Sequence, residues 1–158
     1  MRYVVLAIVA LALQWCLSIP AQAAGVRIDA FEEAFGHIRC MSNSVCIVKE
    51  NDGGVITEFQ KAAQQINQSP VRVKIDGPCY SACTVFADLA RSHVCITPNA
   101  EFGFHVASIN GHTDWSDPMP GNSSDIVKWV NAHGGYPPPD QLLTMHYKDA
   151  SQFWKHCA

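Results

Sequence analysis

Residues 71–90 read Val-Arg-Val-Lys-Ile-Asp-Gly-Pro-Cys-Tyr-Ser-Ala-Cys-Thr-Val-Phe-Ala-Asp-Leu-Ala, and this stretch decides the predicted fold. Apolar and polar residues alternate from Val71 to Ile75, which predicts a strand that ends at the turn residues Gly77-Pro78. The residues from 81 to 90 are mostly apolar and predict a buried helix. A strand, a turn and a helix in this order form one β-α unit.

The same order of elements extends on both sides of this unit. Upstream, the β-branched run 45–48 predicts a buried strand, Asn51-Asp52-Gly53-Gly54 predicts a turn, and residues 57–67 predict a helix. Downstream, two short strands are expected at 93–96 and 101–105. Alternating strands and helices predict an α/β fold with repeated β-α units and a mostly parallel sheet.

The flanking segments are less regular than this centre. A helical pattern runs from Asp29 to Ile38, and residues 106–123, rich in Gly, Asn, Asp, Ser and Pro, predict a long surface loop. Residues 124–132 and 140–147 predict two further helices. The tail is expected to be held by a disulfide at Cys157.

The N-terminus has the pattern of a cleavable signal peptide. An apolar run from Tyr3 to Leu17 follows Met1-Arg2, and Ala21-Gln22-Ala23 fits the small-residue rule for signal peptidase. The run is shorter than the roughly 20 apolar residues of a spanning helix. We therefore expect a signal peptide at 1–23, one domain at 24–158, and a periplasmic or secreted location.

Charge excludes some classes of partner. The chain has 11 Lys+Arg against 14 Asp+Glu, and no segment concentrates basic residues, so we expect no nucleic-acid partner. No second stretch is long and apolar enough to cross a membrane, so no membrane contact is expected after cleavage.

The cysteine count predicts disulfides. Of the seven cysteines, Cys16 leaves with the signal peptide, and an even number remains for up to three bridges in an exported protein. The remaining cysteines are Cys40, Cys46, Cys79, Cys83, Cys95 and Cys157. The spacing of Cys79 and Cys83 is also tolerable for a metal, but an oxidising compartment favours disulfides, so we expect no metal site.

Sequence alone leaves about 15 pairings of six cysteines open. We expect Cys83–Cys95, because the strand that carries Cys95 should pack beside the helix that carries Cys83. Cys40–Cys46 would clamp the first helix to its strand, and Cys79–Cys157 is the remaining pair. Each bridge is expected to contribute about 2–4 kcal/mol of stability.

One constellation of residues fits acyl transfer. Ser81 stands at a strand-to-helix turn, where the amide of Ala82 can stabilise an oxyanion. The turn at Gly53-Gly54 allows a bare backbone to approach closely and supply a second amide. His105 ends a later strand and is the candidate base. Alternatively, Ser81 is a helix N-cap, for which serine is a preferred residue.

Three segments resemble the proteolytic subunit of Clp protease, a serine peptidase of the ClpP/crotonase superfamily. Residues 51–57 (Asn-Asp-Gly-Gly-Val-Ile-Thr) are similar to its Ser-Pro-Gly-Gly-Val-Ile-Thr oxyanion loop. Residues 77–82 resemble its Gly-x-x-(Ala/Ser)-Ser-(Met/Ala) nucleophile turn, and residues 98–105 its Pro-Asn-x-x-x-x-x-His strand. The resemblance covers residues 45–105 and extends to exported ClpP-like bacterial proteins that share Cys-x-Ser-Ala-Cys and Gly-Phe-His.

The resemblance implies a role for each matching residue. Ser81 would be the nucleophile and His105 the general base, with amides of Gly53 or Gly54 and of Ala82 as the oxyanion hole. The family's catalytic aspartate falls at Thr144 or Met145, neither of which is a carboxylate. Asp149 is the candidate third member, and Asp140 is also near in sequence. Loss of the acid can lower turnover about 10⁴-fold.

These observations predict an exported, peptidase-like serine hydrolase that cleaves peptide or ester bonds without a cofactor. The alternative is a non-catalytic ClpP-fold binding or scaffold protein of the periplasm with a protein partner. Acyl-CoA chemistry is disfavoured because CoA belongs to the cytoplasm. Relatives of this fold form trimers or hexamers, so a homo-oligomer stays open, but ring assembly with an ATPase is not implied.

Overall fold

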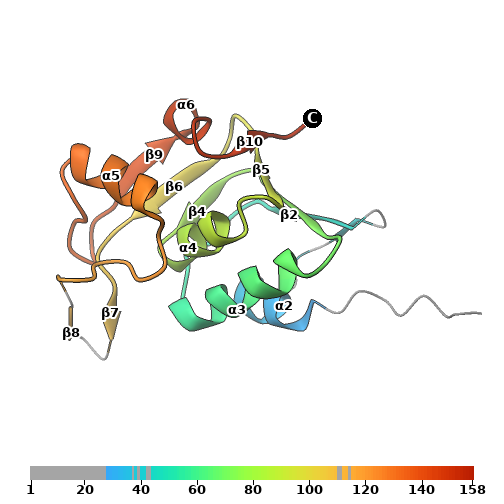
Figure 1. The fold of residues 1–158 in the computed structure, drawn as a ribbon, viewed down its shortest axis with the longest axis horizontal. Helices are drawn as coiled ribbons and strands as arrows, with labels where there is room; N and C mark the ends of the chain where they lie inside the picture. The colour runs from blue at the N-terminus through green and yellow to red at the C-terminus, as the bar shows by residue number, and fades with distance from the viewer. Residues whose placement is uncertain (1–27, 37, 39, 42–43, 110–111, 114) are drawn as a thin grey trace, which may run out of the picture.

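A computed structural model describes residues 28–36, 38, 40–41, 44–109, 112–113 and 115–158. The predicted signal peptide at 1–23 lies outside these residues. The described chain is a mixed α/β structure in which helices pack against two sheets (Figure 1). Among the described residues, no helix is both long and apolar enough to cross a membrane.

The larger sheet confirms the predicted mostly parallel arrangement. Its strand order is β1-β2-β3-β5-β10, in which β2, β3, β5 and β10 are parallel and β1 is antiparallel to β2. Val48, Val73 and Ile75 are buried on its core face. The strands are β1 (Cys40–Met41), β2 (Val45–Val48), β3 (Arg72–Ile75), β5 (Val94–Ile96) and β10 (Lys155–His156).

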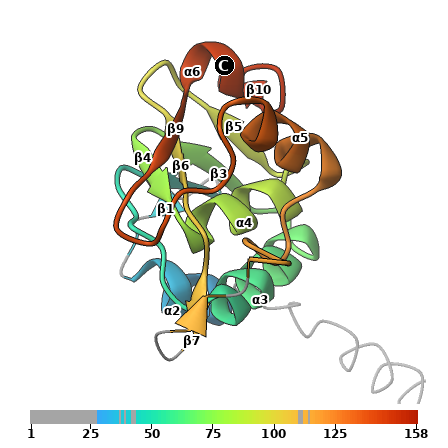
Figure 2. The ribbon, with the colours of Figure 1, turned by 90° about the vertical axis from the view of Figure 1, so that its left-hand side faces the viewer.

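A second sheet of three strands contains the strands that lead into Ser81 and into His105. Its strand order is β4-β6-β9, which Figure 1 shows as neighbouring strands, and Figure 2 views the same sheet after a 90° turn. β4 and β6 are parallel, whereas β9 is antiparallel to β6. Cys79, Phe102 and Met145 are paired across it and are fully buried. The strands are β4 (Pro78–Tyr80), β6 (Glu101–Phe104) and β9 (Leu143–His146).

The helix α4 lies at the centre of the structure, and every residue from Ala82 to Asp88 is buried. Helices α2 and α3 form an outer layer beneath it (Figure 1). An aromatic cluster joins these three helices, with the ring centroids of Phe35 and Phe86 4.6 Å apart and those of Phe35 and Phe59 5.0 Å apart. The helices are α2 (Asp29–Phe35), α3 (Ile56–Asn67), α4 (Ala82–Leu89), α5 (Ser124–Ala132) and α6 (Tyr147–Ala150).

The C-terminal segment is anchored on α4 and the second sheet. The ring of Trp154 stacks on that of Phe102 with centroids 4.1 Å apart. The indole Nε1 of Trp154 donates a buried hydrogen bond of 2.8 Å to the carbonyl oxygen of Ala87. Burial of the indole therefore leaves its polar group satisfied.

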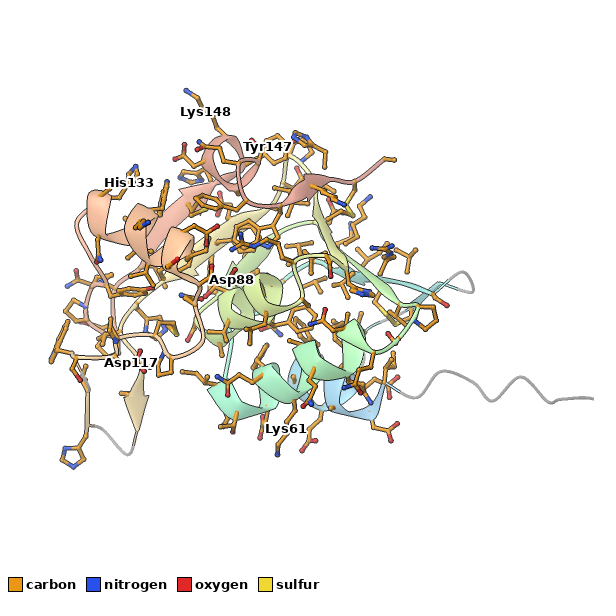
Figure 3. The ribbon with its side chains drawn as sticks, in the orientation of Figure 1. Lys61, Asp88, Asp117, His133, Tyr147 and Lys148 are labelled. Carbon is orange, nitrogen blue, oxygen red and sulfur yellow. A yellow bond between two sulfur atoms is a disulfide. The ribbon has the colours of Figure 1, made fainter. Side chains whose placement is uncertain are left out.

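A buried carboxylate attaches α5 to the end of α4. Asp88, labelled in Figure 3, accepts hydrogen bonds from the Ser123 amide at 2.6 Å and from the Ser123 hydroxyl at 3.0 Å. Arg91 pairs with Asp88 and with Asp125, and its guanidinium lies 5.7 Å from the ring centroid of Trp154. These contacts balance the charge of the buried carboxylate, as burial requires.

Three elements differ from the sequence prediction. The predicted helix at 140–147 is instead the strand β9 followed by α6, because pairing with β6 overrides the local pattern. The predicted loop at 106–123 contains a hairpin of β7 (Ser108–Ile109) and β8 (His112–Thr113). The short strand β4 lies between the predicted strand and helix, and Pro78 is tolerated there as its first residue.

The disulfide pairing corrects two of the three expected bridges. Cys40–Cys46 is present as predicted, but the other pairs are Cys79–Cys83 and Cys95–Cys157. Cys95 lies on β5, whose neighbour is β10, and β10 brings Cys157 beside it rather than beside Cys79. Cys83 lies in the first turn of α4 and is bonded back to Cys79 on β4. Three bridges fit a protein of an oxidising compartment such as the periplasm or the exterior.

Asp76 joins the ends of three strands of the larger sheet. Its carboxylate accepts hydrogen bonds from Thr97 at 2.7 Å, from Lys49 at 2.9 Å and from Asn99 at 3.1 Å. The hydrogen bond from Thr97, followed by those from Lys49 and Asn99, holds the pKa of Asp76 well below its usual range.

The first prediction concerns loop length. Cys95–Cys157 spans 62 positions, whereas Cys40–Cys46 spans 6. By the chain-entropy relation, Cys95→Ala/Cys157→Ala should lower the free energy of unfolding by about 4 kcal/mol, against about 2 kcal/mol for Cys40→Ala/Cys46→Ala. Urea unfolding of the oxidised proteins measures both. Equal losses would contradict the assignment of the long bridge.

The second prediction concerns the loss of stability at low pH. Because the pKa of Asp76 is depressed in the folded state, its carboxylate stabilises the fold above about pH 4, and this contribution is lost as pH falls further. Asp76→Asn should be less stable than the wild type at neutral pH, with a difference that shrinks toward low pH. Thr97→Val removes the hydrogen bond that lowers the pKa of Asp76 most, so it should reduce the same pH dependence. If the urea midpoints of the wild type and of Asp76→Asn differ by the same amount at every pH, the prediction is wrong.

Candidate active site

Ser81 connects β4 to α4 in an unusual backbone conformation. Its φ is 53° and its ψ is −125°, a region that costs a residue with a side chain about 1–3 kcal/mol. The surrounding chain holds it: its amide donates to the Gly103 carbonyl at 2.8 Å, and its own carbonyl accepts from the amide and hydroxyl of Thr84. The turn is therefore determined by its neighbours rather than by local preference.

Ser81 occupies the N-cap position of α4, but its side chain does not act as a cap. A capping serine has extended backbone angles and bonds an amide of the first helical turn. Ser81 has neither feature, since its side chain makes no capping hydrogen bond. Its hydroxyl has no hydrogen-bond partner among the residues that the structure describes, which leaves it available to a bound molecule.

The loop with Gly53 and Gly54 packs directly on the Ser81 turn. The Asn51 amide donates to the Pro78 carbonyl at 2.9 Å, and the Tyr80 amide donates to the Asn51 carbonyl at 2.8 Å. A Cβ added to Gly53 would lie 2.7 Å from the Ser81 Cβ and 2.8 Å from the amide nitrogen of Ala82. Only a residue without a side chain fits this approach, at a φ of 89°.

Two backbone amides at this turn are available to an oxyanion. The Gly53 amide is already used, because it donates to the side-chain oxygen of Asn51 at 2.9 Å. The amides of Gly54 and Ala82 have no acceptor within the described part of the chain. Ala82 is the first residue of α4, where amides lack helical partners and the helix dipole favours negative charge. Of the three predicted oxyanion residues, Gly54 and Ala82 are thus the candidate donors.

His105 follows β6 and is held in one tautomer. Its Nδ1 lies 2.8 Å from the carbonyl oxygen of Val106. A carbonyl oxygen only accepts, so Nδ1 carries the proton and Nε2 keeps the lone pair that a general base needs. Val106 is buried and its amide donates to the Pro137 carbonyl at 2.8 Å, which fixes the orienting group.

The strand register brings Ser81 and His105 to the same edge of the second sheet. Tyr80 pairs with Gly103, and His105 lies two residues beyond Gly103 on the neighbouring parallel strand. No hydrogen bond joins Ser81 to His105 among the contacts of the described residues. Catalytic hydrogen bonds are often long in unliganded enzymes and tighten when substrate binds.

The structure does not bring Asp149 to the other predicted site residues. β9 is antiparallel to β6, and its end at His146 pairs with Glu101, at the start of β6. Asp149 follows in α6, so it lies beyond that end, whereas His105 lies beyond the other end of this four-residue strand. The two ends are about 10 Å apart. Asp140 precedes β9 on the His105 side and is exposed.

Sequence reasoning missed several residues that shape the site. Thr84 and Asn51 bind the backbone on either side of Ser81. Tyr80 packs over Gly103, and its hydroxyl donates to Glu101 at 3.2 Å. Burial, followed by the hydrogen bond to Glu101, raises the pKa of Tyr80. Of these contacts, the sequence signals only that of Asn51, because an asparagine side chain at a turn commonly bonds the backbone amide two residues on.

The described residues hold no group of three or more His, Cys, Asp or Glu side chains placed to bind a metal ion. All six cysteines of the described chain are in disulfides. The polar groups at the Ser81 turn are a hydroxyl, the His105 imidazole and backbone amides.

No protein-family model matches the sequence, and no curated protein is significantly similar to it.

The close approach of Gly53 yields a third prediction. Gly53→Ala places a Cβ against Ser81 and should lower the free energy of unfolding by about 3 kcal/mol, from left-handed backbone and overpacking together. Gly135→Ala is the matched control, since its φ of 84° is similar but nothing lies within 4 Å of its Cβ. It should lose only about 1–2 kcal/mol. Equal losses in urea unfolding would refute the contact with Ser81.

Proposed function

We propose that this chain is an exported serine hydrolase with a ClpP/crotonase-like, peptidase-like active site. The observation that carries the proposal is the backbone of Ser81, which has a φ of 53° at a strand-to-helix turn and a hydroxyl without a capping bond. Such strained residues persist only where the surroundings over-determine them, and they cluster at functional sites. A merely structural serine has no need of this conformation.

The proposed reaction uses the residues at this edge of the sheet. The Ser81 Oγ attacks the carbonyl carbon of a peptide or ester as its proton passes to the Nε2 of His105. The carbonyl oxygen becomes an oxyanion that accepts hydrogen bonds from the amides of Gly54 and Ala82. His105 then gives the proton to the leaving amine or alcohol. Water attacks the acyl-serine by the same route and restores Ser81.

The carbonyl of Val106 takes one part of the role of the missing acid. It fixes the tautomer and orientation of His105, as a carboxylate does in a triad. A neutral carbonyl stabilises the imidazolium less than a carboxylate, because it carries no net charge. We therefore expect a slow enzyme with a serine-histidine pair rather than a full triad.

An exported location is part of the proposal. The disulfide at the site requires an oxidising compartment to form and persist, and the predicted signal peptide gives the route. The substrate is then a peptide or ester bond outside the cytoplasm.

One observation favours the second candidate, a binding or scaffold protein. Within the described residues, Ser81 and His105 share no hydrogen bond, and Asp149 lies at the far end of β6. A domain that had lost catalysis would keep the fold and its exposed edge for a protein partner.

The test is covalent labelling, which gives the fourth prediction. A fluorophosphonate probe should label the oxidised, signal-cleaved protein, and Ser81→Ala should abolish the labelling. His105→Ala should slow it about a hundredfold or more, because the general base is lost. Mass spectrometry of the labelled peptides locates the adduct, and hydrolysis of a p-nitrophenyl ester provides an independent rate.

Two substitutions serve as matched controls. Ser124→Ala removes an exposed serine at the start of α5, and His133→Ala removes an exposed histidine at its end. Both should label at the wild-type rate. If the folded wild type is not labelled, or if labelling survives Ser81→Ala, the hydrolase proposal fails and the binding protein becomes the better account.

A further inference from the structure

A disulfide spans the proposed nucleophile. Cys79 and Cys83 lie two residues before and two residues after Ser81, one on β4 and one in the first turn of α4. Their Cα atoms are 5.2 Å apart, and neither side chain is exposed. We propose that the Cys79–Cys83 disulfide is a positioning element that holds Ser81 in its reactive conformation. This inference rests on the proposed function for its effect on rate, but its structural part can be tested separately.

The first argument is geometric. Relaxing the φ of Ser81 from 53° to an ordinary helical value would rotate the following chain by roughly 110° relative to β4. That rotation would move Cys83 relative to Cys79, whereas a disulfide needs its Cα atoms within about 4.4–6.8 Å. The closed bridge is therefore compatible with the strained turn and opposes its relaxation.

The second argument concerns what else holds the turn. β4 is fixed on both sides, by Asn51 and by β6. The first turn of α4 has fewer backbone bonds to β4, because the amides of Ala82 and Cys83 have no helical acceptor and the Thr84 bonds reach only the Ser81 carbonyl. Cys83 ties this turn to β4. The bridge thereby also holds the Ala82 amide, a proposed oxyanion donor, against the nucleophile.

The third argument is that the bridge does little for the fold as a whole. It spans only 4 positions, against 62 for Cys95–Cys157, and short loops restrict the unfolded chain least. Cys40–Cys46 spans 6 positions and joins β1 to β2 at the edge of the larger sheet. The two short bridges should contribute similarly to stability, so a difference between them in reactivity reports the local role.

The experiment, which is the fifth prediction, compares Cys79→Ala/Cys83→Ala with the matched control Cys40→Ala/Cys46→Ala. Fluorophosphonate labelling at several probe concentrations separates the maximal rate of inactivation from the apparent binding constant. Hydrogen–deuterium exchange of the peptide that covers residues 77–90 reports the turn without any need for activity. Thermal unfolding midpoints show that both variants are folded and comparably stable.

We expect the maximal inactivation rate of Cys79→Ala/Cys83→Ala to fall at least tenfold, with a binding constant within about twofold of wild type. Exchange in residues 77–90 should be faster in this variant alone. In a Ser81→Gly background, removal of the bridge should accelerate exchange less, since glycine adopts the positive φ without strain. The same background recovers folding if the first variant is unstable.

The outcomes separate the two hypotheses. If Cys79→Ala/Cys83→Ala labels as fast as the control variant, or if exchange at the turn is unchanged, the positioning role is overturned. If the wild type is not labelled but exchange at the turn accelerates without the bridge, the hydrolase function fails and the restraint on Ser81 stands.

Discussion

The burial of α4 is the constraint on which the rest of the structure depends. Every residue from Ala82 to Asp88 is buried, so sheets, outer helices and the C-terminal segment must all surround one short helix. Phe86 meets the aromatic cluster of α2 and α3, the Ala87 carbonyl receives the Trp154 indole, and Asp88 receives the start of α5. A helix held on all sides presents its first turn in a fixed place. That is what an active site at its N-terminus needs.

The Ser81 turn is the point where this rigid centre meets solvent. Hydrogen bonds to Gly103 and Thr84 fix both sides of the serine, and its turn occupies the space that a side chain at Gly53 would need. The Cys79–Cys83 disulfide closes the same turn covalently. Several independent restraints thus agree on one unfavourable backbone conformation. Structural redundancy of this kind is expected where strain serves a function.

The histidine side of the site is less complete than the serine side. A backbone carbonyl stands where a triad has a carboxylate, so orientation is retained but charge stabilisation is not. This asymmetry accounts for both proposals. The preorganised serine and amides favour a hydrolase, whereas the weak support of His105 is what a binding protein derived from a hydrolase would keep. Reactivity of Ser81 distinguishes them because it depends on both sides at once.

Sequence by itself determined the parts of this protein that depend on local pattern. The strand at 45–48 was predicted with its observed bounds, and the helix that ends at Ala132 was predicted to within one residue at its start. The close approach of Gly53 to Ser81 followed from the paired glycines. These features follow from side-chain periodicity and backbone freedom, which are properties of neighbouring residues. The resemblance supplied the roles proposed for Ser81 and His105.

The tertiary structure alone decided what depends on distant partners. β9 was predicted as a helix because its strand state exists only through pairing with β6. Cys157 reaches Cys95 because β10 adds to β5, and Asp149 falls at the wrong end of β6 for His105 because β9 is antiparallel. The carbonyl of Val106 carries no signal in the sequence, since every residue has one. Pairing, direction and backbone torsion are set by long-range packing, and local sequence does not record them.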